Sequence, residues 1–162
     1  MNNVIQSENV SFDNKKIQFI FEKVESNGAF KVEQLIYYPY FYFEYRLENK
    51  SLAHPKGGLI GCTVDGVNKI GAIVDSYPRL EKQTVPPNLI QEKLQPEDAE
   101  QIAEEFVFHA ISRKMKVFST PKIKIAEREF FYRPYWIVEG DTDTKDKFML
   151  AVDAVTGKYH PL

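Results

Sequence analysis

Hydrophobic residues recur at helical spacing in two segments of the chain. The clearer segment is residues 96–116, whose apolar positions are three or four apart: Ala99, Ile102, Ala103, Phe106 and Ala110. Pro96 suits the first helical position, where a missing N–H breaks no hydrogen bond. Acidic residues fill the first turns and basic residues the last, an order that complements the helix dipole. The pattern therefore predicts a helix with one apolar stripe.

The second segment, residues 12–26, fits two structures. Its apolar residues form one face of a helix: Ile17, Ile20, Phe21 and Val24. Ser11 would cap this helix and Gly28 would follow its end. Apolar residues also alternate here, and Asn27-Gly28 is a strong hairpin turn, so a hairpin is the alternative. Because the second half of the chain begins with a clear helix, we predict a helix here too.

Shorter stretches have the pattern of strands. We predict strands near residues 30–37, 40–48, 58–65 and 69–75, and again near residues 122–131, 135–139, 147–152 and 158–160. Pro134 predicts an edge, a bend or a strand start. Residues 153–157 predict a tight turn in which Gly157 takes a positive φ. Residues 79–95, which contain two adjacent prolines, are predicted to be a linker.

The two halves of the chain resemble each other. Aromatic residues occupy seven of the nine positions from Tyr37 to Tyr45 and five of the seven from Phe130 to Trp136. With a shift of 95 positions, four residues coincide with identical ones: Tyr37 with Tyr132, Pro39 with Pro134, Tyr40 with Tyr135 and Glu44 with Glu139. With a shift of 88, the segment VDGV at 64–67 coincides with VDAV at 152–155. The change of shift places a longer loop in a hairpin of the first copy, where insertions are tolerated. We therefore predict an internal duplication.

The composition excludes several classes of protein. With 43% hydrophobic residues, 27% charged residues and a net charge of −2, the chain is neither a disordered tail nor a typical nucleic-acid binder. No apolar run reaches the roughly 18 residues that a membrane helix needs. The first ten residues contain no lysine or arginine and no apolar core follows, unlike a signal peptide. We expect a cytoplasmic protein that contacts neither nucleic acid nor membrane.

The second half resembles PepSY domains. The resemblance covers about residues 95–160 and rests on the proline-led acidic helix, the segment RPYWIVE and the ending FMLAVDAVTGKYHP. In the first half, VDGVNKIG is a weaker match. The resemblance implies an α+β fold, PepSY-like or cystatin-like, in which a helix packs on an antiparallel sheet. It also implies a non-catalytic role in binding or regulating peptidases. We predict two such repeats, at residues 1–78 and 96–162, joined by the linker at 79–95.

Patterns for catalysis and metal binding are missing from the sequence. There is no GxSxG, HExxH, P-loop or GxGxxG motif. His54, His109 and His160 each lack a second histidine or cysteine at ligand spacing, so we expect no metal site and no cofactor. Cys62 lies in an apolar stretch without a basic neighbour, which predicts a buried structural thiol.

Two surfaces are candidate binding sites. On a strand, one face would carry Tyr38, Tyr40 and Tyr42, and the other Phe41, Phe43 and Tyr45. The tyrosine face, together with Tyr135 in the second copy, suits a protein or peptide partner; alternatively, it is covered where the copies pack. Phe108, Ile111 and Met115 lie away from the predicted helix stripe, which indicates burial against the first copy or in a homodimer.

The function that fits best is a non-catalytic binding or regulatory module for a protein or peptide. The alternative is a small-molecule-binding protein or hydrolase-type enzyme with a pocket between helix and curved sheet. An enclosed pocket with convergent polar side chains would favour the alternative, and a filled core with an exposed aromatic face the first function.

Overall fold

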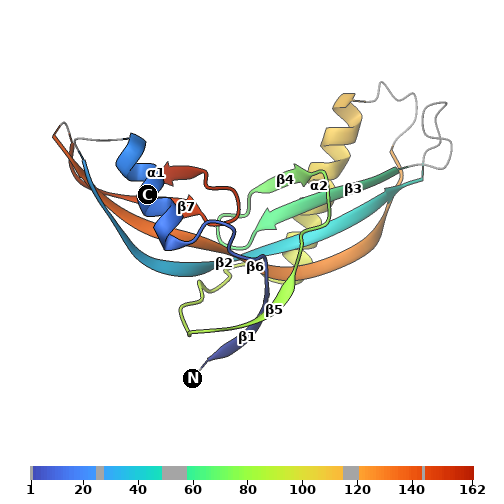
Figure 1. The fold of residues 1–162 in the computed structure, drawn as a ribbon. Helices are drawn as coiled ribbons and strands as arrows, with labels where there is room; N and C mark the ends of the chain where they lie inside the picture. Colours follow the sequence, from blue (N-terminus) through green and yellow to red (C-terminus); the bar gives the residue numbers. More distant parts are fainter. Residues whose placement is uncertain (1, 25–27, 49–57, 115–120, 144) are drawn as a thin grey trace. The chain divides into compact units, whose positions relative to one another are not determined.

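The chain forms an α+β structure with two helices and an eight-stranded mixed sheet (Figure 1). The computed structural model describes residues 2–24, 28–48, 58–114, 121–143 and 145–162. The elements in chain order are β1 (Asn3–Ser7), α1 (Asn14–Val24), β2 (Ala29–Leu47), β3 (Gly58–Asp65), β4 (Gly71–Val74), β5 (Glu81–Val85), α2 (Pro96–Lys114), β6 (Ile123–Thr142), β7 (Lys145–Asp153) and β8 (Tyr159–Pro161).

The strand order is β4-β3-β2-β6-β1-β5, while β7 pairs with β6 and with β8. The α+β class is as predicted. The sheet is mixed rather than purely antiparallel, because β1 meets β6 in parallel at Ser7 and Tyr132.

Contacts divide the chain into two compact units, and each unit is made of separate segments. Unit 1 contains Met1–Tyr38, Arg79–Ile90 and Tyr132–Leu162, and unit 2 contains Pro39–Pro78 and Gln91–Phe131. The long strands β2 and β6 each contribute to both units. The predicted division into consecutive repeats, 1–78 and 96–162, therefore does not follow the compact units.

In unit 1, the segment with two possible structures forms the helix α1 rather than a hairpin. Its N-cap is Asp13 and not Ser11, because Asp13 Oδ1 accepts a hydrogen bond from the Lys16 N–H at 2.9 Å. The cap lies two residues later than predicted, so the helix begins at Asn14.

The core of unit 1 joins α1 to strands that come much later in the sequence. Ile17 and Phe21 of α1 are buried together with Val138 of β6 and with Leu150 and Val152 of β7. In Figure 1, α1 lies beside β7 and β8. The first helix therefore packs on strands of the second half as well as on the start of β2, where Phe30 stacks on Phe21.

In unit 2, α2 lies on one face of β3 and β4 (Figure 1). The residues that face the sheet are spaced by four: Ala99, Ala103, Val107 and Ile111. The predicted stripe differs, since Phe106 is 40% exposed and Ala110 is only half-buried. Phe106 instead lies at the sheet edge, where a Cβ added to Gly71 would be 3.0 Å from its ring. The small side chains of Ala99 and Ala103 leave room for the aromatic residues of β2 beneath the helix.

Pro39 and Pro134 do not interrupt their strands. Both are fully buried, and β2 and β6 continue through them. The Pro39 carbonyl accepts a hydrogen bond from the Gly66 N–H at 3.0 Å, and the Pro134 carbonyl accepts one from the Ala154 N–H at 3.0 Å. Each proline thus lies where the hairpin turn needs an acceptor rather than a donor, which explains why the strand tolerates it.

The segment predicted as a linker contains the strand β5. It pairs antiparallel with β1, from Asn3–Val85 to Ser7–Glu81. Ile5 and Val85 are buried with Tyr37 in a small separate core of unit 1.

The hairpins β2–β3 and β6–β7 have the same register. Tyr40 pairs with Asp65 in the first hairpin, and Tyr135 pairs with Asp153 in the second. In both turns the aspartate Oδ1 accepts hydrogen bonds from the backbone N–H groups two and three residues later, at 2.8–3.3 Å. The aspartate side chain therefore stabilises the turn in the same way twice.

The two turns differ in strain, which gives a prediction for stability. Lys69 has a φ of 63°, whereas the equivalent Gly157 has a φ of 78°, as the sequence predicted for the glycine. A side chain disfavours this region by about 1–2 kcal/mol. We expect Lys69→Gly to leave the free energy of unfolding unchanged or raise it by up to about 1 kcal/mol, and Gly157→Ala to lower it by about 1–2 kcal/mol, in urea denaturation. A clear loss of stability in Lys69→Gly would contradict this account.

Candidate functional site

In unit 2, β2 separates two sets of aromatic side chains. One set lies in the core under α2: Phe41, Phe43 and Tyr45. On the other face, Tyr40 is half-buried and stacks on Phe131, with 5.7 Å between ring centroids. Tyr42, for which the sequence left a binding face or a covered face open, is only 1% exposed. It is covered because a second tyrosine lies over it.

That second tyrosine is Tyr77. Its ring meets the Tyr42 ring at 75°, with 4.9 Å between centroids. The Tyr42 hydroxyl donates to Glu44 Oε2 at 2.9 Å, and the Tyr77 hydroxyl donates to Glu129 Oε2 at 3.0 Å. Gly61 provides the space, since a Cβ there would be 2.8 Å from Tyr42 Oη. We call Tyr42, Glu44, Tyr77 and Glu129 the Tyr42–Tyr77 site.

A pocket of about 400 Å³ adjoins the Tyr42–Tyr77 site. It is lined by Tyr42, Glu44, Leu59, Ile60, Gly61, Ile73, Val74, Asp75, Ser76 and Tyr77. Two large side chains of this lining stay exposed on the face of Tyr42, namely Leu59 at 55% and Tyr77 at 44%. Ile73 lies opposite the buried Cys62 in the strand register, so its side chain is on the α2 face. The pocket lies beside β4, and among the described residues no strand pairs with the outer edge of β4. The site is therefore a partly apolar surface next to an open sheet edge.

Carboxylates dominate the charge of this surface. Burial, and then the hydrogen bond to Glu129, raises the pKa of Tyr77 to about 12. Burial, followed by the hydrogen bond to Glu44, raises the pKa of Tyr42 well above its ordinary value. The negative charge of Glu127 contributes to both pKa shifts. Both phenols therefore stay protonated at neutral pH. The described residues that line the pocket include Glu44 and Asp75 but no lysine or arginine.

The remaining residues predicted to bind lie elsewhere. Tyr38 and Tyr135 belong to unit 1, where their rings meet edge to face at 6.0 Å. Phe108 is half-buried. Ile111 is buried in the core beneath α2 and so does not lie on a separate face, because the helix is rotated relative to the predicted stripe. Met115 lies outside the described residues.

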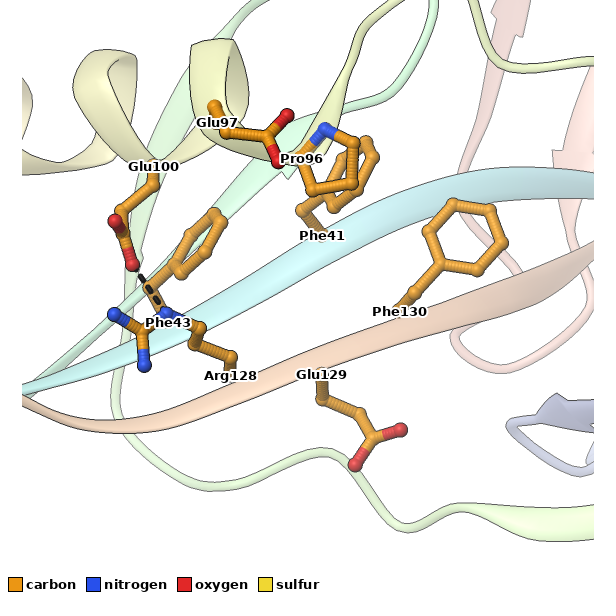
Figure 2. A pocket seen from close by; sticks show the side chains of 8 residues that line it. All are labelled: Phe41, Phe43, Pro96, Glu97, Glu100, Arg128, Glu129 and Phe130. Carbon is orange, nitrogen blue, oxygen red and sulfur yellow. Dashed lines mark hydrogen bonds and ion pairs between the residues drawn. The ribbon is translucent and has the colours of Figure 1, made fainter.

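A second pocket, of about 300 Å³, lies between the start of α2 and the strands β2 and β6 (Figure 2). Its lining consists of Phe41, Phe43, Pro96, Glu97, Glu100, Arg128, Glu129 and Phe130. Three phenylalanine rings form the apolar part, and Arg128 forms an ion pair with Glu100 beside them. The carboxylate of Glu129 points away from α2 (Figure 2), toward the hydroxyl of Tyr77 on the other face.

Groups with metal-binding or nucleophilic chemistry do not gather in the part of the chain that the structure describes. It contains no cluster of three histidine, cysteine, aspartate or glutamate residues that could hold a metal ion. His109 and His160 are exposed, and His54 lies outside the described residues. Cys62 is buried, as predicted, and burial raises the pKa of its thiol to about 11, which makes it unreactive.

A network of charged side chains in unit 1 has a structural role. Arg133 contacts Asp153 at 2.7 Å and Glu8 at 2.9 Å, and all three side chains are largely buried. Burial alone would lower the pKa of Arg133, but the hydrogen bond and charge of Asp153 outweigh it and raise that pKa. The network ties the end of β1 to the second hairpin.

Sequence patterns did not identify Tyr77 or Glu129. Tyr77 stands alone between Ser76 and Pro78, and nothing local relates it to a residue thirty-five positions earlier. Gly61 was the available signal, because a glycine inside a strand often marks the close approach of another group.

Comparison of the chain with protein-family models, with curated proteins and with solved structures gives no significant match in any of the three. The resemblance to PepSY domains therefore stays a prediction. No helix among the described residues is both long and apolar enough to cross a membrane.

The raised pKa values predict how stability depends on pH. A group whose pKa is higher in the folded than in the unfolded state stabilises the fold below its unfolded pKa and loses that contribution as the pH rises. For Tyr77 the loss occurs as the pH rises from the unfolded pKa, about 10, to the folded pKa, about 12.

Glu129→Gln removes a negative charge but keeps an acceptor oxygen, so we expect it to lower the Tyr77 pKa, measured by NMR titration of labelled tyrosine. Titration of Tyr77 near about 10 in the unmodified protein would contradict the contact.

Proposed function

We propose that this protein is a non-catalytic module that binds a peptide, or a segment of another protein, at the Tyr42–Tyr77 site. The observation that supports this most directly is the exposed apolar lining of the adjoining pocket, formed by Leu59 and Tyr77. Clustered exposed apolar side chains are typical of interaction surfaces. A tyrosine at such a surface offers a large, rigid ring with little conformational entropy to lose.

The neighbouring strand β4 supports a specific mode of binding. An extended segment could add to the outer edge of Gly71–Val74 through main-chain hydrogen bonds, while its side chains reach the pocket. Tyr42 is already held by Tyr77 and Glu44, so a partner would meet a preformed surface and little ordering would oppose binding.

Binding of a small molecule in the α2 pocket is the second candidate function. The phenylalanine rings of Phe41, Phe43 and Phe130 favour it, because they give the pocket an apolar wall (Figure 2). The ion pair between Arg128 and Glu100 lies beside these rings, so a ligand has to share the pocket with it. Polar groups do not converge there from several sides, and we therefore rank this function second.

We also propose that the two hairpins arose by duplication of a PepSY-like unit. The equal register at Asp65 and Asp153 and the equal proline-carbonyl contacts support a common origin. The regulatory role that the resemblance implies is part of the same proposal.

Selection of random peptides displayed on phage tests the proposed binding. The unmodified protein and its Tyr77→Ala variant serve as parallel targets, and affinities of the selected peptides are measured by calorimetry. We expect peptides selected on the unmodified protein to bind Tyr77→Ala at least about tenfold more weakly, because a few aromatic side chains dominate such interfaces.

Tyr159→Ala is the matched control, since Tyr159 is a comparably exposed tyrosine (51%) in unit 1. Leu59→Ser probes the same pocket from β3 should Tyr77→Ala reduce stability. If no peptide distinguishes the unmodified protein from both pocket variants, the Tyr42–Tyr77 site is not a binding site.

A further inference from the structure

We infer that the partner segment places a basic side chain, lysine or arginine, against Tyr77, next to an apolar residue that covers Leu59. The inference rests on the proposed function and specifies the chemistry of the ligand. It is carried by the carboxylates around an exposed aromatic ring, which form no ion pair with any described lysine or arginine, although Arg46 lies on the same face of β2 opposite Leu59.

Four carboxylates surround the exposed ring. Glu44 and Asp75 line the pocket, Glu129 accepts the hydrogen bond of the Tyr77 hydroxyl, and the charge of Glu127 acts on that hydroxyl. Among the described residues, no lysine or arginine forms an ion pair with any of these four. The surface therefore has an electrostatic potential that favours a cation.

In the second hairpin, the carboxylate at the position equivalent to Glu44 has a basic partner. Glu139 aligns with Glu44, but it lies 3.8 Å from the ammonium group of Lys147. Glu44 instead accepts from the Tyr42 hydroxyl, a neutral donor that leaves the carboxylate charge in place. The chain thus compensates one of two equivalent carboxylates and leaves the other to a partner.

The ring itself adds to this preference. The face of a neutral tyrosine attracts a cation through its quadrupole, and Tyr77 is 44% exposed. Burial first, and then the neighbouring carboxylates, raise the pKa of Tyr77, so its phenol is neutral at physiological pH. A long basic side chain suits the pocket better than a compact ion, since its methylene groups can lie on Leu59 while its charged end reaches Glu44 or Asp75.

The peptides selected by phage display on the unmodified protein provide the test. We expect lysine or arginine to be enriched in the peptides that depend on Tyr77. Replacing the enriched basic residue by glutamine should weaken binding about tenfold, and raising the salt concentration should weaken the basic peptide more than its glutamine form.

Variants of the protein locate the contact. Glu44→Gln and Asp75→Asn remove charge while they retain acceptor oxygens, and each should weaken the basic peptide about threefold or more. Glu139→Gln, the matched control in unit 1, should leave the affinity unchanged.

The two proposals fail in different ways. Peptides that depend on Tyr77 and Leu59 but bind equally well with glutamine in place of the basic residue would overturn the inference and leave the proposed function standing. Peptides that bind without any dependence on Tyr77 or Leu59 would overturn both.

Discussion

Between Tyr40 and Tyr45, β2 carries large aromatic side chains on both of its faces, and both faces have to be shielded from water. A strand separates its side chains by parity, so a single layer cannot cover them. On one side α2 buries Phe41 and Phe43 beneath a row of small residues. On the other side only a short segment with Tyr77 covers Tyr42. Both covers bury the rings beneath them, but Tyr77 itself stays 44% exposed. The pocket that we propose as a binding site lies beside this exposed residue.

Local chemistry in the sequence was enough to predict α2, the turn at Gly157 and the buried thiol of Cys62. Each depends on a few neighbouring residues. The helix depends on a proline followed by acidic residues, the turn on an aspartate and a glycine, and the buried thiol on the apolar residues around it. The long strands were harder, since Pro39 and Pro134 resemble interruptions. Their carbonyl contacts to the hairpin turns become visible only when the pairing is known.

Other features depend on which distant segments meet, and periodicity carries no information about this. The pairing of β5 with β1 joins residues almost eighty positions apart, from a segment rich in polar residues. The cover of Tyr42 by Tyr77 and the packing of α1 on β7 are of the same kind. The rotation of α2 has a different cause: small alanines, rather than the larger Phe106, face the rings of β2.

The discontinuous units also determine the order in which the chain can bury its surface. Ile17 and Phe21 become buried against Leu150 and Val152, which belong to the last part of this sequence. During synthesis, α1 can pack early only on Phe30 and Val32 of β2, and the rest of its apolar face stays exposed until β6 and β7 are added. Contacts of such large sequence separation slow folding and lengthen the time in which exposed apolar surface can aggregate. A newly made chain of this protein thus depends on β6 and β7 to complete the burial of α1.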